Sequence, residues 1–325
     1  MVKAVVVEQH GGPEVLQIKE VDIKKPGSGE VLIKQTAIGL NFMDIRQRAG
    51  SFPVESPPFV VGSEACGVVE EVGSDVPEFR KGDRVAYATT ITGAYTEARV
   101  INHNYLVPVP DYISDEVAAS LMLKGMTAFY LLRRTFFISE KHTILVHAAA
   151  GGVGQLLCKL AKHFGGNVIA TVGSEEKKPI VRSLGIDKVI NYNKNFVKLV
   201  EKYTDGKGVH VVYDSIGKDT FNRSLNCLAE FGLMVNYGWS SGEAQPLQLS
   251  KLLKKSLFVT RPSLFTYTQF REELLLNSNE VFTLAQQKVI TPNIFKKYKL
   301  SEVAEAHEDL ENKKTTGQSI ISIKT

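Results

Sequence analysis

Residues 144–165 read ILVHAAAGGVGQLLCKLAKHFG, an apolar run that meets a series of small residues and then continues at helical spacing. The pattern predicts a buried strand, a tight turn and a helix, in that order. In the turn, Ala149, Gly151 and Gly154 match the dinucleotide-binding fingerprint, with alanine at the position of the first glycine. Gly151 and Gly152 allow the backbone to approach a pyrophosphate, which the N–H groups of the helix N-terminus attract. A small-residue turn chosen only for packing is the alternative.

The rest of this half of the chain repeats the alternation of strand and helix. Six compact apolar runs follow Gly125, most of them separated by stretches long enough for a helix: TILVHA, NVIATV, KVINY, VHVVYDSI, GLMVNYG and SLFVTRP. This repetition predicts an α/β fold with a doubly wound parallel sheet of six strands. The fingerprint lies in the first of these strand–helix units, which is the context that it requires.

Residues 1–124 have a different texture. Short β-rich runs such as KAVVVE, EVLIKQTAI, ACGVVEEVG and DRVAYA alternate with Gly, Pro and Asp, which predicts a twisted antiparallel module. After the sixth apolar run, a helical segment at residues 268–289 leads to a final strand at residues 319–325, which we expect to join this first module. The predicted domains are therefore residues 1–124 with 267–325, and an inserted unit of residues 125–266.

The composition describes an ordinary globular protein of 325 residues, 43% hydrophobic and 23% charged, with a net charge of +4. No apolar stretch reaches about 18 residues and the N-terminus lacks the features of a secretory signal, so we expect a cytoplasmic protein. The three cysteines are widely separated, which predicts free thiols in a reducing compartment. The basic clusters at residues 251–256 and 295–300 are short, and we expect them on solvated faces rather than against nucleic acid. The histidines lack zinc-ligand spacing, so no metal site is predicted.

The end of the second predicted strand bears on the choice between the two nicotinamide dinucleotides. An NAD site places Asp or Glu about 20 residues after the glycines, whereas this strand ends in Val172, Gly173 and Ser174. No carboxylate stands at the strand tip to repel a 2′-phosphate, and Lys177 and Lys178 follow closely. The sequence therefore predicts NADPH.

Two glutamates argue in the other direction. Glu175 and Glu176 follow the strand directly, and we interpret both as residues of the next helical turn, where acidic side chains complement the helix dipole. Tyr192, at the end of the third predicted strand, is expected beside the phosphate or the adenine, or else as a half-exposed strand aromatic.

Ordered motifs along the whole chain carry a family resemblance. They include HGGPEVL, AIGLNFMD, GSEACGVVEEVG, LKGMTAFYLL, HAAAGGVGQ, VVYDSIGKDTF and VTRPSL. In these motifs the chain resembles the zinc-independent NADPH:quinone oxidoreductases of the medium-chain dehydrogenase/reductase superfamily, which include zeta-crystallin. The resemblance implies a discontinuous GroES-like catalytic domain, an inserted Rossmann domain, NADPH in the cleft between them, and a homodimer. It also implies hydride transfer without zinc, because Gly62, Ser63 and Glu64 stand where zinc-dependent relatives have Gly-His-Glu.

The resemblance also implies roles for individual residues. At the nicotinamide end, the NF-x-D segment of the family matches Asn41, Phe42 and Asp44, so the expected catalytic residues are Asn41, Asp44 and Arg46. Arg46 stands where close relatives commonly have a tyrosine thought to position substrate, and it is expected either to bind an anionic group or to be a solvated helix residue. The expected cofactor-binding residues are Asn41, Phe42, Gly125, Thr127, Tyr130, Gly151, Gly152, Val153, Gly173, Ser174, Lys177, Tyr192, Ser215, Gly238 and Arg261.

The predicted activity is hydride transfer from NADPH to a quinone or a related conjugated carbonyl. A reduced quinone takes its protons from solvent, so the reaction requires no general acid from the protein. Reduction of an alkenal or enone is the second hypothesis, and it needs a proton donor for carbon. A non-catalytic, crystallin-like protein that binds NADPH or RNA is the third.

Overall fold

A computed structural model describes residues 1–323 and divides the chain into two compact units. Unit 1 contains residues 1–126 and 267–325, and unit 2 contains residues 127–266. The last two residues of the strand predicted at 319–325, Lys324 and Thr325, lie outside the described residues. None of the helices in the described part of the chain combines the length and apolar character that crossing a bilayer requires.

Unit 2 is built on a six-stranded sheet with the strand order β11-β10-β9-β12-β13-β14. Every neighbouring pair in it is parallel. The strands are β9 (Thr143–Val146), β10 (Asn167–Val172), β11 (Val189–Asn191), β12 (Val209–Asp214), β13 (Leu228–Asn236) and β14 (Phe258–Thr260). The doubly wound parallel sheet predicted from the six apolar runs is confirmed, and the chain reverses its direction of winding between β11 and β12, as in a Rossmann fold.

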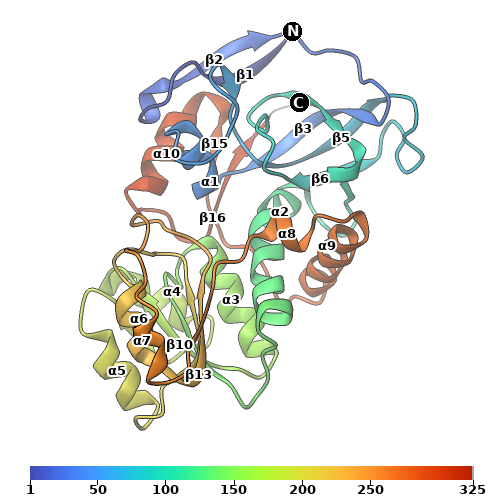
Figure 1. The fold of residues 1–325 in the computed structure, drawn as a ribbon. Coiled ribbons are helices and arrows are strands. Elements are labelled where there is room, and N and C mark those ends of the chain that lie inside the picture. Colours follow the sequence, from blue (N-terminus) through green and yellow to red (C-terminus); the bar gives the residue numbers. More distant parts are fainter. Residues whose placement is uncertain (324–325) are drawn as a thin grey trace. The chain divides into compact units, whose positions relative to one another are not determined.

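Helices cover both faces of this sheet (Figure 1). Their bounds are η3 (a π-helix, Leu131–Thr135), α3 (Gly152–His163), η4 (Glu175–Lys177), α4 (Lys178–Arg182), α5 (Phe196–Tyr203), α6 (Phe221–Cys227) and α7 (Ser250–Leu253). Figure 1 shows α5, α6 and α7 on one side of the strands and α3 on the other. Phe196 from α5 and Leu225 from α6 join Leu145, Ile169 and Met234 of the strands in one buried cluster. Burial of these apolar side chains stabilises unit 2.

The turn between β9 and α3 has the backbone that its small residues predict. Ala148 has a φ of +50°, in the left-handed region, and the Ala149 N–H donates to the Thr171 carbonyl on β10 at 2.8 Å. Gly151 is the N-cap of α3. A Cβ at Gly154 would lie 2.4 Å from the Ala148 carbonyl oxygen, so only glycine lets the helix pack this close to the turn.

Unit 1 contains a three-stranded sheet, β2-β1-β4, and a seven-stranded sheet, β15-β16-β3-β5-β6-β8, in which β7 also pairs with β3. The first includes β1 (Val2–Val7), β2 (Leu16–Val21) and β4 (Phe59–Val60). The second includes β3 (Glu30–Gly39), β5 (Glu64–Val72), β6 (Arg84–Ala88), β7 (Ala98–Asn102), β8 (Val107–Pro108), β15 (Ile294–Lys299) and β16 (Gln318–Ser322). Because β16 pairs with β3, the C-terminal segment completes a sheet that begins near the N-terminus.

Beside the β-rich runs that the sequence predicted, unit 1 contains several helices. They are η1 (Pro13–Val15), α1 (Phe42–Arg48), η2 (His103–Tyr105), α2 (Asp115–Tyr130), α9 (Arg271–Gln286), η5 (Leu300–Glu302) and α10 (Val303–Glu311), with α8 (Leu264–Tyr267) at the end of unit 2. The 16-residue α2 runs without a break through Lys124 and Gly125 into unit 2. Its sequence is apolar on most sides, so it lacks the periodicity by which an amphipathic helix is recognised.

The contacts of the β9–α3 turn generate the first prediction. We expect Gly154→Ala to lower the free energy of unfolding by about 1–3 kcal/mol, because the new methyl group meets backbone atoms that cannot move aside. Gly151→Ala is the matched control: its Cβ would meet only the Ala148 carbonyl oxygen, at 3.2 Å, and should cost much less. Urea unfolding of both variants checks the difference, and equal losses would show that packing of the turn is not the constraint.

Candidate functional site

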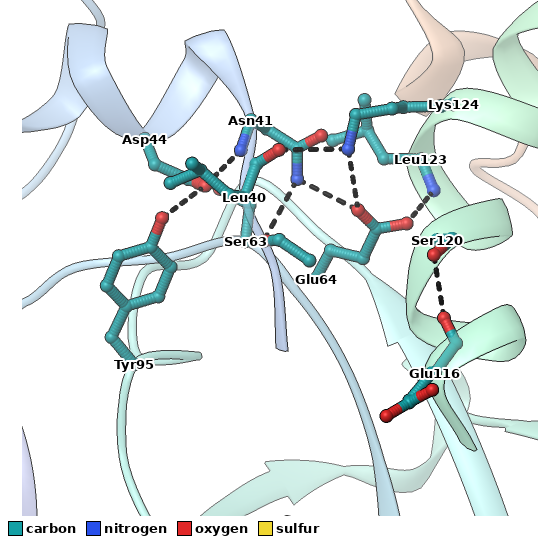
Figure 2. A network of polar contacts seen from close by, with 11 residues as sticks. Leu40, Asn41, Asp44, Ser63, Glu64, Tyr95, Glu116, Ser120, Leu123 and Lys124 are labelled. Atoms are coloured by element: carbon teal, nitrogen blue, oxygen red, sulfur yellow. Dashed lines mark hydrogen bonds and ion pairs between the residues drawn. The ribbon is translucent and has the colours of Figure 1, made fainter. Parts of the chain in front are cut away.

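A cluster of buried polar side chains lies at the end of β3 and the start of α1 in unit 1 (Figure 2). Asn41 is the N-cap of α1, and its backbone N–H donates to Asp44 Oδ2 at 2.8 Å. This contact is local, since a residue three positions into a helix can reach back to the N-cap. The structure therefore brings together Asn41 and Asp44, two of the three predicted catalytic residues.

The side-chain amide of Asn41 is held from one side only. Its Nδ2 donates to Glu64 Oε2 at 2.9 Å and to the Gly39 carbonyl at 3.3 Å. Its Oδ1 is buried and has no hydrogen-bond partner among the described residues. Buried acceptors are normally paired, so this oxygen is the one atom of the cluster that calls for a donor from outside it.

Glu64 is a fully buried carboxylate at the first position of β5. It accepts hydrogen bonds from Asn41 and from the Leu123 backbone N–H, the latter at 2.6 Å, and Lys124 Nζ lies 3.7 Å from Oε2. Lys124 also donates to the Leu40 carbonyl at 2.9 Å. Burial raises the pKa of Glu64, and Lys124 opposes the rise; burial likewise lowers the pKa of Lys124, and Glu64 opposes that. Figure 2 shows this carboxylate between the amide of Asn41 and α2.

Asp44 is also fully buried, and all its contacts are with donors. Besides the Asn41 N–H, it accepts from Ser63 Oγ at 2.8 Å and from the Tyr95 hydroxyl at 3.0 Å. Burial raises the pKa of Asp44 to about 7, although these hydrogen bonds and the charge of Lys124 oppose the rise. The contact of Asp44 with the Asn41 N–H caps the start of α1.

A chain of hydrogen bonds continues from Asp44 toward the protein surface. The Tyr95 hydroxyl lies 3.2 Å from His307 Nε2, and His307 Nδ1 lies 3.2 Å from Arg48. Arg48 donates to Glu311 at 2.7 Å, a contact between α1 and α10. Burial and the nearby Arg48 lower the pKa of His307 to about 3, so His307 is neutral. This chain fixes α1 against the rest of unit 1.

Sequence reasoning missed several members of this cluster. Glu64, Lys124, Tyr95 and His307 come from four separate segments, and only the fold brings them together. Ser63 stands where zinc-dependent relatives have a histidine ligand, and here its hydroxyl accepts a hydrogen bond from Gln47 at 2.9 Å and donates one to Asp44. The local sequence signal for this cluster was the spacing of Asn41 and Asp44, which matches a helix N-cap and its third residue.

The other predicted residues of unit 1 lie near this cluster in sequence but have different surroundings. Phe42 and Arg46 are half-buried on α1. Gly125 is in α2, where a Cβ would lie 2.8 Å from Val281 of α9, so the glycine has a packing role, and its contact with the cofactor stays a prediction. Thr127 and Tyr130 follow on α2 within unit 2, and both are buried.

In unit 2, the remaining predicted residues gather along one edge of the sheet. Parallel strands have their carboxyl ends at the same edge, and each residue follows the end of a strand. The set comprises Gly151, Gly152 and Val153 after β9, Gly173, Ser174 and Lys177 after β10, Tyr192 after β11, Ser215 after β12, Gly238 after β13 and Arg261 after β14. This edge is where open α/β sheets bind their ligands.

At this edge, two of the predicted glycines lie close to neighbouring residues. A Cβ at Gly173 would lie 3.0 Å from the hydroxyl of Tyr192, and a Cβ at Gly238 would lie 3.1 Å from Ser215 Cα. Tyr192 is buried rather than half-exposed. Arg261 lies over the ring of Trp239, 4.4 Å from its centroid.

The acidic residue nearest the tip of β10 is engaged by lysines. Glu175 lies 2.8 Å from Lys178 Nζ and 2.9 Å from Lys194 Nζ. These two lysines lower its pKa to about 2, so the carboxylate is ionised. It belongs to η4, which agrees with its interpretation as a residue of the next helical turn.

The donor set does not fit zinc. Within residues 1–323, no three His, Cys, Asp or Glu side chains are grouped so that they could hold a metal ion. Glu64 faces only donors, and Ser63 is hydrogen-bonded on both sides. The cysteines are buried and free, and burial raises the pKa of Cys158 and Cys227 to about 12, so both are thiols rather than thiolate ligands.

Comparison with known proteins places the chain in a class and then in a family. Residues 27–111 match the alcohol dehydrogenase GroES-like domain, and residues 152–278 match the zinc-binding dehydrogenase family. A quinone oxidoreductase of Pseudomonas aeruginosa is 44% identical over 323 residues, covering 99% of both chains. A 2-haloacrylate reductase of Burkholderia sp. is 42% identical, again covering 99% of both chains.

A solved structure agrees closely with the fold. The Escherichia coli quinone oxidoreductase complexed with NADPH superposes with a TM-score of 0.96 at 43% identity, covering 99% of this chain and 100% of that one. The GroES-like unit and the Rossmann sheet define a member of the medium-chain dehydrogenase/reductase superfamily. Within it, the chain belongs to the quinone oxidoreductase family, as the sequence motifs predicted.

The raised pKa of Asp44 generates the second prediction. Its folded-state value of about 7 exceeds the ordinary 3.8, so its contribution to stability is complete below pH 3.8 and is lost as the pH rises through 7. We expect the unfolding free energy of the parent, relative to Asp44→Asn, to fall by about 2–3 kcal/mol between about pH 5 and pH 8. Denaturant unfolding at both pH values measures this difference, and a difference that stays flat or grows would contradict the assignment.

Proposed function

We propose that this chain is an NADPH-dependent oxidoreductase that reduces a quinone or a related conjugated carbonyl. The observation that carries the proposal is the convergence of the glycine-rich α3 N-terminus, Gly173 and Lys177 at the carboxyl edge of the sheet in unit 2. Membership of the quinone oxidoreductase family, and the NADPH bound to the Escherichia coli relative, support it. When bound, NADPH supplies a hydride, and the reduced quinone takes a proton from solvent.

The residues present fit a phosphorylated dinucleotide. The first turn of α3 leaves backbone N–H groups without intrahelical acceptors and carries a partial positive charge, which suits a pyrophosphate. Gly173 keeps the end of β10 open, since a side chain there would meet Tyr192. Glu175 is held by Lys178 and Lys194, so its charge is balanced beside the tip of β10, and Lys177 in the same turn is the residue proposed to meet a 2′-phosphate.

In unit 1, Asn41 is proposed to bind the nicotinamide half. Its unpaired Oδ1 accepts a hydrogen bond, and both the carboxamide and the ribose hydroxyls of that half are donors. Asp44 holds the backbone of Asn41 and is surrounded by protein donors, so it is not placed to give a proton to substrate. For Arg46 both predicted roles stay open, a contact for an anionic group of substrate or cofactor and a solvated helix residue.

A second activity, reduction of a carbon–carbon double bond next to a carbonyl, is favoured by one comparison. The 2-haloacrylate reductase of Burkholderia sp. is nearly as similar as the quinone oxidoreductases. This reaction requires proton delivery to carbon, and the buried Asp44 has its hydrogen bonds satisfied within the protein. Quinone reduction is therefore the first choice, and a non-catalytic protein that binds NADPH or RNA is the third.

The proposal includes a metal-free reaction in the cytoplasm. The donor set around Ser63 and Glu64 supports the first point, and the three free, buried cysteines support a reducing compartment. The domain assignment belongs to the proposal as well: residues 1–124 with 267–325 act on substrate, and residues 125–266 bind NADPH.

We also propose a homodimer formed through the open edge of the unit 2 sheet. β14 is the last strand of that sheet, and its edge has no partner strand in the described chain. Phe258 on β14 is 59% exposed, and Leu249 and Leu253 before it are exposed as well. A two-fold axis would pair β14 with its own copy, extend the sheet and bury this apolar surface.

The cofactor assignment generates a prediction for Lys177. Loss of a charge-assisted hydrogen bond to the 2′-phosphate should cost on the order of 1–3 kcal/mol, which is roughly ten- to a hundredfold in affinity. We expect Lys177→Ala to raise KM for NADPH by that factor and to leave KM for NADH nearly unchanged. Steady-state kinetics with both cofactors check this, with Lys198→Ala on α5 as the control. A parent that prefers NADH, or equal losses for both cofactors, means that Glu175 or Glu176 binds the ribose.

The acceptor assignment predicts that kcat/KM for simple benzoquinones and naphthoquinones exceeds that for short alkenals and 2-haloacrylates. NADPH oxidation followed with each acceptor measures the order, and an enone that outperforms the quinones would reverse the choice between the two activities. The same assay with a chelator present tests the metal-free reaction, which should proceed at an unchanged rate. If the protein binds NADPH but fails to oxidise it with any of these acceptors, the result would favour the non-catalytic alternative.

For the dimer, we expect Phe258→Lys to convert the protein to a monomer, because it places a charge at the centre of the proposed apolar contact. Light scattering coupled to size-exclusion chromatography measures the mass. Phe270→Lys is the control, since Phe270 is 67% exposed but lies in unit 1. A parent that is already monomeric, or a Phe258→Lys variant that stays dimeric, overturns this interface.

A further inference from the structure

The side chain of Asn41 has one atom without a hydrogen-bond partner, and Glu64 determines that this atom is the oxygen Oδ1 rather than the nitrogen Nδ2. An asparagine amide can be turned by 180° at little steric cost, which exchanges its oxygen and nitrogen. In this cluster the turn is forbidden electrostatically, because it would place Oδ1 against Glu64 Oε2, where Nδ2 now lies at 2.9 Å. The carboxylate therefore decides which atom of Asn41 is left for a ligand.

Glu64 serves this purpose only while it is ionised, and its contacts require that. Three donors face it, from Asn41, the Leu123 N–H and Lys124, whereas a protonated carboxyl would need an acceptor in place of one of them. Lys124 in turn donates to the Leu40 carbonyl, directly before Asn41 in the chain. The pair thus holds both the amide and the backbone of this segment.

We propose that Glu64, held by Lys124, is a positioning residue that fixes the amide of Asn41 so that Oδ1 is always the acceptor for a donor on the nicotinamide half of NADPH. The inference rests on the proposed function and deepens it, because it assigns to a buried ion pair a role in recognising one half of the cofactor. Glu64 itself touches no part of the ligand. A glutamine in its place would have an amide able to face either atom of Asn41, and the preference would be lost.

The test compares two ligands by direct binding to the full chain: NADPH, and adenosine 2′,5′-bisphosphate, which lacks the nicotinamide half. We expect Glu64→Gln to weaken NADPH about ten- to a hundredfold and the bisphosphate by less than about twofold. Glu64→Asp keeps the charge beside Lys124 but shortens its reach, and should weaken NADPH by an intermediate factor. Asp115→Asn, which breaks the ion pair with Arg84 on the same unit, is the control and should bind both ligands as the parent does.

A double-mutant cycle isolates the coupling between the two side chains. In an Asn41→Ala background, Glu64→Gln should weaken NADPH by no more than about twofold, because the oxygen that it positions is gone. Equal weakening of both ligands, parent-like affinity of both Glu64 variants, or a full additional loss in the Asn41→Ala background would overturn the inference. A parent that binds the bisphosphate but gains nothing from the nicotinamide half also overturns it, whereas a parent that binds neither ligand overturns the proposed function itself.

Discussion

Burial of the Glu64 carboxylate is the constraint on which the arrangement of unit 1 depends. An ionised group without water must be paired and hydrogen-bonded, or its burial costs several kcal/mol. Glu64 meets this requirement with donors from three places: Asn41 after β3, the Leu123 N–H inside α2, and Lys124 one residue further on. Each donor is fixed by the same contact that satisfies the charge. The start of α1, the first residue of β5 and the middle of α2 are therefore held together, and Asn41 is left with a single free acceptor.

In unit 2 the candidate site is shaped by backbone geometry rather than by a buried charge. Parallel strands bring six carboxyl ends to one edge, and the turns that follow them are shaped by close contacts at Gly154, Gly173 and Gly238. Ala148, with its left-handed backbone, and the N-cap Gly151 form the turn that leaves the N-terminus of α3 at this edge. The helix N–H groups and the lysine charge proposed to attract a phosphorylated ligand there need no buried ion pair.

The difference between the two units explains what the sequence could and could not predict. The sheet of unit 2 is local in origin, since each apolar run and its following glycine are read from a short window, and its six strands were predicted correctly. The cluster around Asn41 depends on Glu64, Tyr95, Lys124 and His307, which lie far apart in the chain, so no local pattern announces it. Helix α2 was missed because it is apolar on most sides, and Gly125 has a packing reason, its contact with Val281, that its motif did not reveal. The roles of Arg46 and of the residues along the sheet edge stay predictions.

Both units are proposed to serve one reaction, in which a hydride leaves NADPH for an oxidised acceptor. The sharpest test is a single-turnover experiment in which the enzyme is mixed with a naphthoquinone and with NADPH that carries deuterium in place of one or the other of the two hydrogens on C4 of the nicotinamide. We expect oxidation of the bound cofactor within one turnover and a primary isotope effect for only one of the two labelled forms, because the protein presents a single face of the nicotinamide. Bound NADPH that is not oxidised, or oxidation with no isotope effect for either form, would contradict it.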